Sequence, residues 1–266
     1  MTKYVFIDYD GTFANGSVVP PEHVDAVRRA RAAGHRVLLC TGRPRCMFPD
    51  DIAEDFDGIV ALAGGYVELD GEVLMDTVFP AEVAREAQRL LTEHDVVYTL
   101  ESATGLRSPA DRAERLREMA RQNGDPRSAF TEVIDALVVD DGPAEFGKVM
   151  CWASSVPVAE IGAALGPLVA SIPTSLPGLV GNAGELYLAG ITKAVGVDAV
   201  VRARGISADD IVAIGDGYND LEMLQYAGTA VVVEGAPPAI LAEADLIVGR
   251  PDDHGVLRAF EQLALI

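Results

Sequence analysis

The sequence is poor in cysteine and histidine, and both shortages exclude classes of protein. Its three cysteines, Cys40, Cys46 and Cys151, form neither a C-x-x-C pair nor a zinc-binding spacing. They therefore predict reduced thiols in a cytoplasmic protein rather than a disulfide framework. The four histidines are scattered along the chain and suggest no metal cluster.

Positive charge is also scarce. The 266 residues include 21 Lys and Arg against 41 Asp and Glu, which gives a net charge of −20. Such a surface repels nucleic acid and anionic lipid, so neither is predicted as a partner. An anionic substrate would then need a local positive site, supplied by a metal ion, a few basic residues or helix N-termini.

No apolar run is long enough for a membrane helix. The longest uncharged stretch, residues 161–184, contains three prolines and cannot form one continuous helix. The apolar run near the N-terminus is interrupted by Asp8 and Asp10, so it does not resemble a signal peptide. We therefore expect a soluble protein, long enough for one large domain or two smaller ones.

Strand and helix patterns alternate at both ends of the chain. Short apolar runs of the kind that form buried parallel strands lie at 4–8, 36–40, 58–64, 211–215, 230–233 and 246–248. Helical patterns lie at 22–34, 193–204, 219–226, from Pro237 onward and at 254–264. A hairpin turn is predicted at Asp70-Gly71.

The middle of the chain has a different character. Helical stretches at 81–93, 111–122 and 157–165 mix there with strand-like runs at 96–100, 146–152 and 168–172. The pattern predicts an α/β fold with a doubly wound, mostly parallel core sheet, interrupted by an inserted domain. We assign residues 1–80 and 188–266 to the core and residues 81–187 to the insertion.

Four polar segments lie where core strands end or a helix begins. They are "DYDGT" (8–12), "CTGR" (40–43), Lys193 in "GITKAVGV", and "GDGYND" (215–220). In an open α/β sheet, ligands bind beyond the carboxyl ends of the strands. Lys193 is notable because a cation in the first turn of a helix opposes the helix dipole, so its presence indicates a separate purpose.

The order and spacing of these segments resemble the haloacid dehalogenase superfamily of phosphohydrolases. That family's motifs run Asp-x-Asp-Gly-Thr, Thr or Ser, Lys, and Gly-Asp-x-x-x-Asp. The insertion after the second motif, together with "GDGYNDLEML", resembles the Cof-type branch, subclass IIB, with an α/β cap that selects the substrate. The resemblance implies a Mg²⁺-dependent phosphatase acting on a small phosphorylated metabolite, with a sugar phosphate as the first expectation.

The resemblance also assigns roles to the acidic residues. Asp8 matches the nucleophile that forms an aspartyl phosphate, and Asp10 matches the acid and base that protonates the leaving oxygen and then activates water. Asp8, Asp216 and the backbone carbonyl of Asp10 would hold Mg²⁺, a hard cation that prefers oxygen ligands. Asp220 would support the metal, either as a direct ligand or through a neighbouring group.

Phosphate binding falls to a second set of residues. Thr41, Lys193, Asn219 and the backbone N–H of Gly42 match groups that hold phosphoryl oxygens. The next residue, Arg43, is open to two interpretations, since it could bind substrate or pair with an acidic side chain.

Two other functions fit the same motifs. Some sugar phosphomutases have this type of cap, and they would retain the phosphate on the product. A phospho-accepting regulatory module also combines acids, a Thr and a Lys, but such modules lack a large insertion and a second carboxylate like Asp10. Two departures from the family pattern, Gly64-Gly65 and "EGAPP" (234–238), leave the substrate open. The sequence gives no oligomeric state.

Overall fold

The structure, a computed structural model, describes residues 2–16, 18–48, 54–123, 129–142, 144–173, 179 and 182–266. It divides into two compact units. The core unit comprises Met1–Arg43, Phe48–Met75 and Thr192–Ile266, and the inserted unit comprises Pro44–Met47 and Asp76–Ile191. Pro44–Met47 thus group with the insertion, although only three residues separate them from the second strand of the core, which ends at Cys40.

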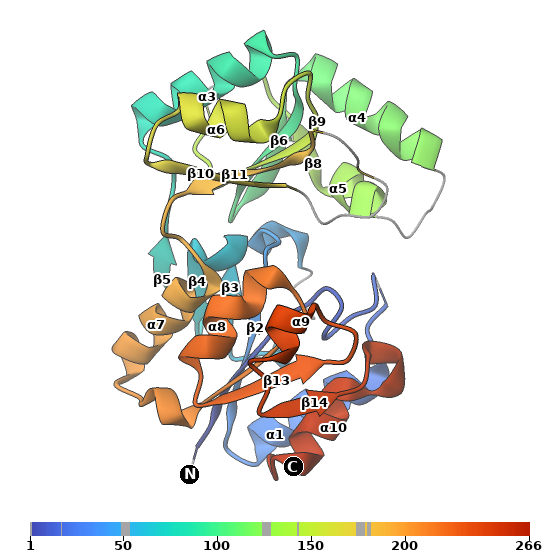
Figure 1. Ribbon diagram of the computed structural model, residues 1–266, viewed down its shortest axis with the longest axis vertical. Helices are drawn as coiled ribbons and strands as arrows, with labels where there is room; N and C mark the ends of the chain where they lie inside the picture. The colour runs from blue at the N-terminus through green and yellow to red at the C-terminus, as the bar shows by residue number, and fades with distance from the viewer. Residues whose placement is uncertain are drawn as a thin grey trace. The chain divides into compact units, whose positions relative to one another are not determined.

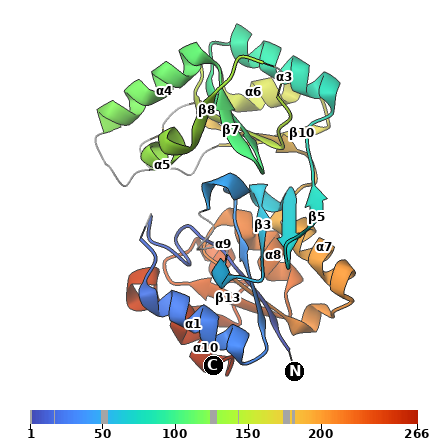
Figure 2. The same cartoon turned by 180° about the vertical axis from the view of Figure 1, so that it is seen from behind.

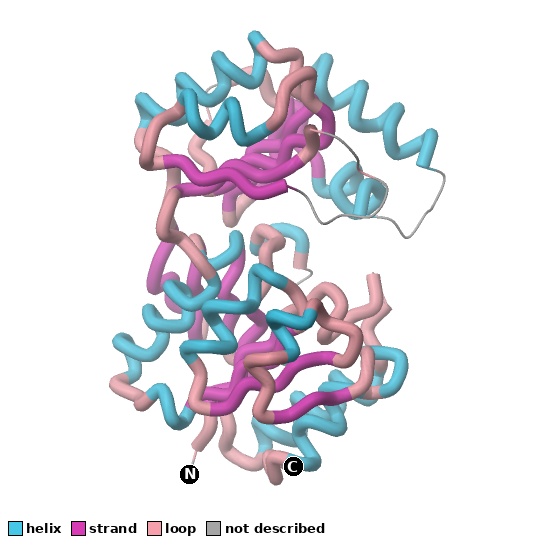
Figure 3. The backbone as a smooth tube through the Cα atoms, viewed as in Figure 1, coloured by secondary structure: helices cyan, strands magenta, loops and turns pink. Residues whose placement is uncertain are grey.

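The core unit is built on one eight-stranded sheet (Figure 3). Its strand order is β14-β13-β12-β1-β2-β3-β4-β5, and every pair from β14 to β3 is parallel, whereas β3 and β4 are antiparallel. The strands are β1 (Tyr4–Ile7), β2 (Arg36–Cys40), β3 (Gly58–Ala61), β4 (Tyr66–Leu69), β5 (Glu72–Asp76), β12 (Ile211–Gly215), β13 (Thr229–Val233) and β14 (Leu246–Val248).

Helices cover both faces of this sheet, as the opposite views in Figures 1 and 2 show. They are α1 (Pro21–Ala32) and α10 (Gly255–Gln262) on one face, and α7 (Lys193–Arg204), α8 (Leu221–Tyr226) and α9 (Pro238–Leu241) on the other. Between the sheet and α7 and α8, apolar side chains such as Phe6, Val200 and Met223 are fully buried. The predicted doubly wound, mostly parallel α/β core is therefore confirmed.

The inserted unit has a six-stranded sheet of its own, in the order β10-β11-β9-β6-β7-β8. All its pairs are antiparallel except β7 and β8. The strands are β6 (Val97–Ser102), β7 (Gly105–Ser108), β8 (Leu137–Val139), β9 (Lys148–Ala153), β10 (Val169–Pro173) and β11 (Gly184–Leu188). The helices are α3 (Ala81–Glu93), α4 (Ala110–Asn123), α5 (Ala129–Ala136) and α6 (Val158–Ala164).

Alternating side chains of this second sheet form two apolar clusters. Tyr98 and Leu100 pack with residues of α3 and α6, whereas Val97, Met150 and Trp152 pack with Leu116 of α4 and Val133 of α5. Trp152 is a core residue of this unit, because it is only 3% exposed. Across the described residues, no helix is long and apolar enough to cross a membrane.

His23, in the first turn of α1, ties the loop after β1 to the last helix. Its side chain is completely buried. Nδ1 donates to the carbonyl of Phe13 at 2.9 Å, and Nε2 accepts from the backbone N–H of Val256 at 3.3 Å. Both ring nitrogens are satisfied only in the neutral tautomer, and burial, with a smaller contribution from His254, lowers the pKa of His23.

This contact predicts acid sensitivity below neutral pH. A histidine whose folded-state pKa is depressed contributes stability that is present above its unfolded pKa of about 6.5 and is lost as the pH falls through the folded value. His23→Gln keeps one donor and one acceptor but does not titrate. We expect the wild type to lose about 1 kcal/mol of unfolding free energy relative to His23→Gln between pH 7 and pH 5, measured by urea denaturation. His94→Gln is the control, and equal pH slopes for wild type and His23→Gln would contradict the assignment.

Candidate active site

Asp8 stands at the carboxyl end of the central strand of the core sheet. β1 ends at Ile7, and the backbone N–H of Asp8 continues the ladder by donating to Ile214 of β12 at 2.9 Å. The Asp8 side chain is only 7% exposed. A carboxylate in such a position needs a charged partner, because desolvating it alone costs several kcal/mol (order of magnitude).

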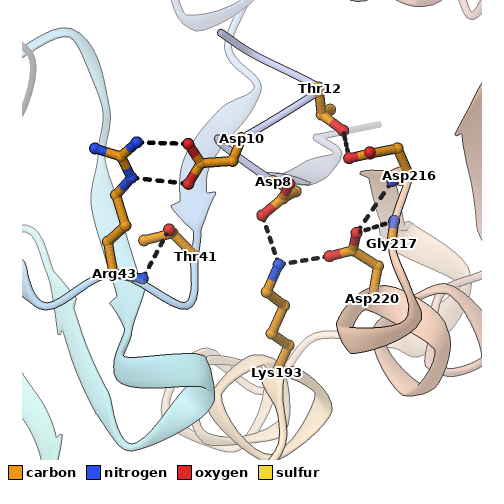
Figure 4. A network of polar contacts seen from close by, with 9 residues as sticks. All are labelled: Asp8, Asp10, Thr12, Thr41, Arg43, Lys193, Asp216, Gly217 and Asp220. Atoms are coloured by element: carbon orange, nitrogen blue, oxygen red, sulfur yellow. Dashed lines mark hydrogen bonds and ion pairs between the residues drawn. The ribbon is translucent and has the colours of Figure 1, made fainter. Parts of the chain in front are cut away.

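That partner is Lys193, the first residue of α7 (Figure 4). Its Nζ donates to Asp8 Oδ1 and to Asp220 Oδ1, each at 2.5 Å, and its side chain has no exposure. The start of α7 can come this close because Gly64 has φ +106° and a Cβ there would lie 1.9 Å from the carbonyl oxygen of Thr192. Gly64, one of the departures from the family pattern, therefore helps to position Lys193.

Asp216 and Asp220 come from the segment that follows β12. Asp220 Oδ2 accepts from the backbone N–H groups of Asp216 at 3.0 Å and Gly217 at 2.9 Å, which fixes the turn. Asp216 Oδ1 accepts from the hydroxyl of Thr12 at 2.8 Å. The loop after β1 and the loop after β12 are thereby joined (Figure 4).

The cluster holds more negative than positive charge. Carboxylate oxygens of Asp8, Asp216 and Asp220 lie within 4.8 Å of one another. Burial, followed by repulsion from Asp220, raises the pKa of Asp8 well above its ordinary value, and the same two causes raise the pKa of Asp216. Burial alone would lower the pKa of Lys193, but Asp220 and Asp8 outweigh that effect and raise it. Lys193 therefore stays protonated, and one cation faces three acids.

These residues suit a hard divalent cation. The donor set is made of carboxylate oxygens, with no histidine or thiol among the three residues, and such a set favours Mg²⁺ over zinc. The uncompensated charge gives a physical reason for a further cation here. Asp220 already uses its oxygens on Lys193 and on two backbone N–H groups, which favours Asp8 and Asp216 as the direct ligands.

Asp10 lies apart from this buried cluster. Its side chain is 49% exposed, and both of its oxygens accept from the guanidinium of Arg43, from Nε at 2.8 Å and from Nη2 at 2.6 Å. Sequence reasoning left Arg43 open between substrate binding and ion pairing, and the structure shows an ion pair with an acid of the first motif. Among the described residues, Asp10 is also not part of the group of carboxylates that could hold a metal ion.

The remaining predicted phosphate-binding residues lie on neighbouring loops. Thr41 directly follows β2, is fully buried, and its Oγ1 accepts from the backbone N–H of Arg43 at 3.1 Å. Asn219 is exposed, and its Nδ2 would be 3.9 Å from a Cβ placed on Gly42. The four sequence segments thus converge at the carboxyl ends of β1, β2 and β12 and at the start of α7.

Thr12 is the residue that sequence reasoning gave no role. Its hydroxyl orients Asp216, and the approach is tight, because a Cβ on Gly11, at φ +87°, would lie 2.6 Å from Asp216 Oδ2. The signal was present in the "DGT" of the first motif, where Gly allows the turn and Thr supplies a hydroxyl.

Comparison with known proteins places this geometry in a family. A family model described as haloacid dehalogenase-like hydrolase matches residues 5–260. The chain is 27% identical over 276 residues to the 5-amino-6-(5-phospho-D-ribitylamino)uracil phosphatase YbjI of Escherichia coli, covering 98% of this chain and 96% of that protein. It is 26% identical over 282 residues to the putative phosphatase YxeH of Bacillus subtilis, covering 100% and 99%.

A longer relative and two solved structures extend the comparison. A putative bifunctional phosphatase/peptidyl-prolyl cis-trans isomerase of Streptococcus pyogenes is 28% identical over 99% of this chain, but the chain spans only 54% of that protein. A protein of Geobacillus kaustophilus superimposes with a TM-score of 0.82 at 24% identity, each chain fully covered. A sugar phosphatase of subclass IIB, BT4131, superimposes with a TM-score of 0.79 at 21% identity, again with full coverage of both. These two structures show a shared fold.

Proposed function

The chain belongs to the haloacid dehalogenase-like hydrolases, as a subclass IIB phosphatase of the Cof type, and we propose that it hydrolyses a sugar phosphate through an aspartyl phosphate on Asp8. Phosphatases of this class act on small phosphorylated metabolites. The observation that carries the proposal is the position of Asp8 at the end of β1, buried, paired with Lys193 and grouped with Asp216 and Asp220.

In the first step an oxygen of Asp8 attacks phosphorus while the bond from phosphorus to the ester oxygen breaks. Lys193 holds Oδ1 of Asp8, and Oδ2 accepts no hydrogen bond from any described residue, so it is the oxygen left for attack. Asp10 gives its proton to the departing ester oxygen. The attack is that of a weak nucleophile on an anion, and fixed positive charge such as that of Lys193 must stabilise the transition state.

In the second step water attacks the aspartyl phosphate and the bond between phosphorus and Asp8 breaks. Asp10, now ionised, takes a proton from that water, which leaves the enzyme in its starting state. Thr41, Asn219, Lys193 and the N–H of Gly42 would bind the phosphoryl oxygens in both steps. This double use of Asp10 is what separates a hydrolase from a module that keeps its phosphate.

A bound Mg²⁺, held by Asp8, Asp216 and the carbonyl of Asp10 with support from Asp220, would neutralise phosphate charge and align the phosphoryl group with Asp8. The donor set and the excess negative charge described above support this choice of ion.

The sugar phosphate is supported by what the relatives are said to act on. Two relatives are phosphatases of a ribityl-bearing phosphate ester, and one structure of the same fold is a sugar phosphatase. The ribityl group named for the first two is polyhydroxylated, as a sugar is. We further propose that residues 81–187 act as the cap that selects among such esters. A cytoplasmic location, and the absence of nucleic acid and membrane partners, remain predictions.

Phosphate release from a panel of metabolite esters, with and without Mg²⁺, tests the proposed function. We expect no turnover in excess chelator, recovery with Mg²⁺, and poor recovery with Ca²⁺, whose looser coordination would misplace the nucleophile. Among the esters tested, sugar phosphates should release phosphate fastest. Full activity in excess chelator would overturn the metal assignment, and phosphate that stays on the product at a new position would identify a phosphomutase.

A further inference from the structure

Among the residues that the structure describes, Arg43 alone supplies side-chain hydrogen bonds to the carboxylate of Asp10. Its Nε and Nη2 donate to the two oxygens at 2.8 and 2.6 Å, and no other described side chain bonds to that carboxylate. Asp8 and Asp220, in contrast, are buried and share Lys193. A half-exposed aspartate has several staggered rotamers open to it, so a fork of two parallel hydrogen bonds is what selects one of them.

Arg43 is the better anchored member of the pair. Its side chain is 16% exposed against 49% for Asp10. Its backbone N–H donates to Thr41 Oγ1 at 3.1 Å and its carbonyl accepts from Leu62 at 3.0 Å. The guanidinium carbon also lies 5.0 Å from the centre of the Tyr9 ring, within the range of a cation–π contact. The loop after β2 thus presents a fixed cation to the loop after β1.

The structure assigns Arg43 as the positioning residue of Asp10, an inference that rests on the proposed function. A general acid must come within about 3 Å of the oxygen that it protonates, and a misplacement of about 1 Å can cost roughly 10²-fold in rate. In the first step the proton passes from Asp10 to the ester oxygen, and in the second a proton passes from water to Asp10. Arg43 acts on both steps through the position of one carboxylate.

A competing role is direct binding of phosphoryl oxygens by the guanidinium. The two roles differ in one respect that can be measured. If Arg43 acts through Asp10, its replacement has no further effect once Asp10 can no longer transfer protons. If it binds phosphate, its effect persists in that background.

The test is a double-mutant cycle of Arg43→Gln and Asp10→Asn, followed by rapid mixing with p-nitrophenyl phosphate and a sugar phosphate. With Asp10 unchanged, we expect Arg43→Gln to slow steady turnover of both esters about 10- to 100-fold. A burst of nitrophenolate should remain, because that leaving group hardly needs a proton. In the Asp10→Asn background, Arg43→Gln should change neither the burst rate nor the residual steady turnover by more than about twofold, within the usual additivity error. Arg43→Lys should recover little, because an ammonium cannot form the fork.

Arg28→Gln is the matched control. Arg28 forms a similar fork with Asp55, at 2.6 and 3.1 Å, on the exposed side of α1, and its loss should leave both rates unchanged. Equal slowing by Arg43→Gln in both backgrounds would overturn the positioning role in favour of phosphate binding. Unchanged turnover in a folded Arg43→Gln protein would also overturn it. If the wild type released no nitrophenolate, the proposed function would be wrong, and so would the inference about Arg43.

Discussion

Asp8→Asn should leave a folded protein with no turnover of any phosphate ester and no trapped phosphoenzyme. The amide keeps the size of the carboxylate but is not a nucleophile. It also removes one negative charge from a cluster in which three acids face Lys193, so the fold is not expected to suffer. Acid quench followed by detection of phosphate bound to protein measures the loss directly.

Asp10→Asn should behave differently with different leaving groups. In the proposed mechanism the nucleophile remains, but the proton donor is lost, which typically lowers rates by roughly 10² to 10⁴. A sugar alkoxide needs the proton, so phosphoenzyme formation from a sugar phosphate should become slow. Nitrophenolate leaves without it, so p-nitrophenyl phosphate should give a burst. The variant should then stall as an aspartyl phosphate, because in the proposed mechanism Asp10 is also the base that activates water.

The contrast between these two variants is the decisive measurement. Nitrophenolate release on the millisecond scale and acid-trapped phosphate on Asp8 should rise together in Asp10→Asn and be absent in Asp8→Asn. Asp25→Asn, on the exposed side of α1, controls for loss of a surface charge. Equal loss on both ester types without a burst would show that Asp10 serves mainly to hold the metal site together.

The convergence of the motifs was predictable from sequence. Asp8, Thr41 and Asp216 each follow a short apolar run, and the carboxyl ends of parallel strands meet at one edge of a sheet. Lys193 was conspicuous because it opposes the dipole of its own helix, and the structure gives the reason, since the lysine lies buried between Asp8 and Asp220. Both inferences need only the chain's local pattern.

Contacts between side chains of different loops were not predictable in the same way. Neither the fork between Arg43 and Asp10 nor the bond from Thr12 to Asp216 has a spacing rule, because each depends on how two loops approach. The secondary structure of the inserted unit was also only partly predictable from the sequence. Sequence patterns gave α3, α4, α6, β6, β9 and β10, but they missed β7, α5, β8 and β11. These elements are 3 to 8 residues long, and over so few residues periodicity is a weak guide, which finds some short elements, such as β10 and α6, and misses others.

Lys193→Met should cost both stability and catalysis. Methionine fills a similar volume but leaves Asp8 and Asp220 buried without their cation, and breaking a buried ion pair from one side typically costs about 3–5 kcal/mol. Turnover should fall roughly 10²- to 10³-fold, because a fixed charge near the transferred phosphoryl group is lost.

The loss of stability should depend on pH with a definite sign. The pKa of Asp8 is already raised in the folded protein, and removal of Lys193 would raise it further. A group whose folded pKa is raised favours the folded state below its unfolded pKa of about 4 and loses that contribution as the pH rises through the folded value. Lys193→Met should therefore differ least from wild type near pH 5 and most near pH 8, by urea denaturation.

The effect of a divalent cation on stability should distinguish the loss of Lys193 from the loss of a buried lysine elsewhere in the chain. Mg²⁺ at millimolar concentration should restore part of the stability of Lys193→Met, because a second cation then faces Asp8 and Asp216. Lys148→Met is the matched control, since Lys148 is also buried, with Glu101 at 3.0 Å and Glu185 at 3.4 Å, in the inserted unit. It should also destabilise the protein, but without recovery in Mg²⁺. If Mg²⁺ restored the stability of both variants, or of neither, then Lys193 and the bound cation would not both stabilise the Asp8 carboxylate. The metal site would then have to lie elsewhere.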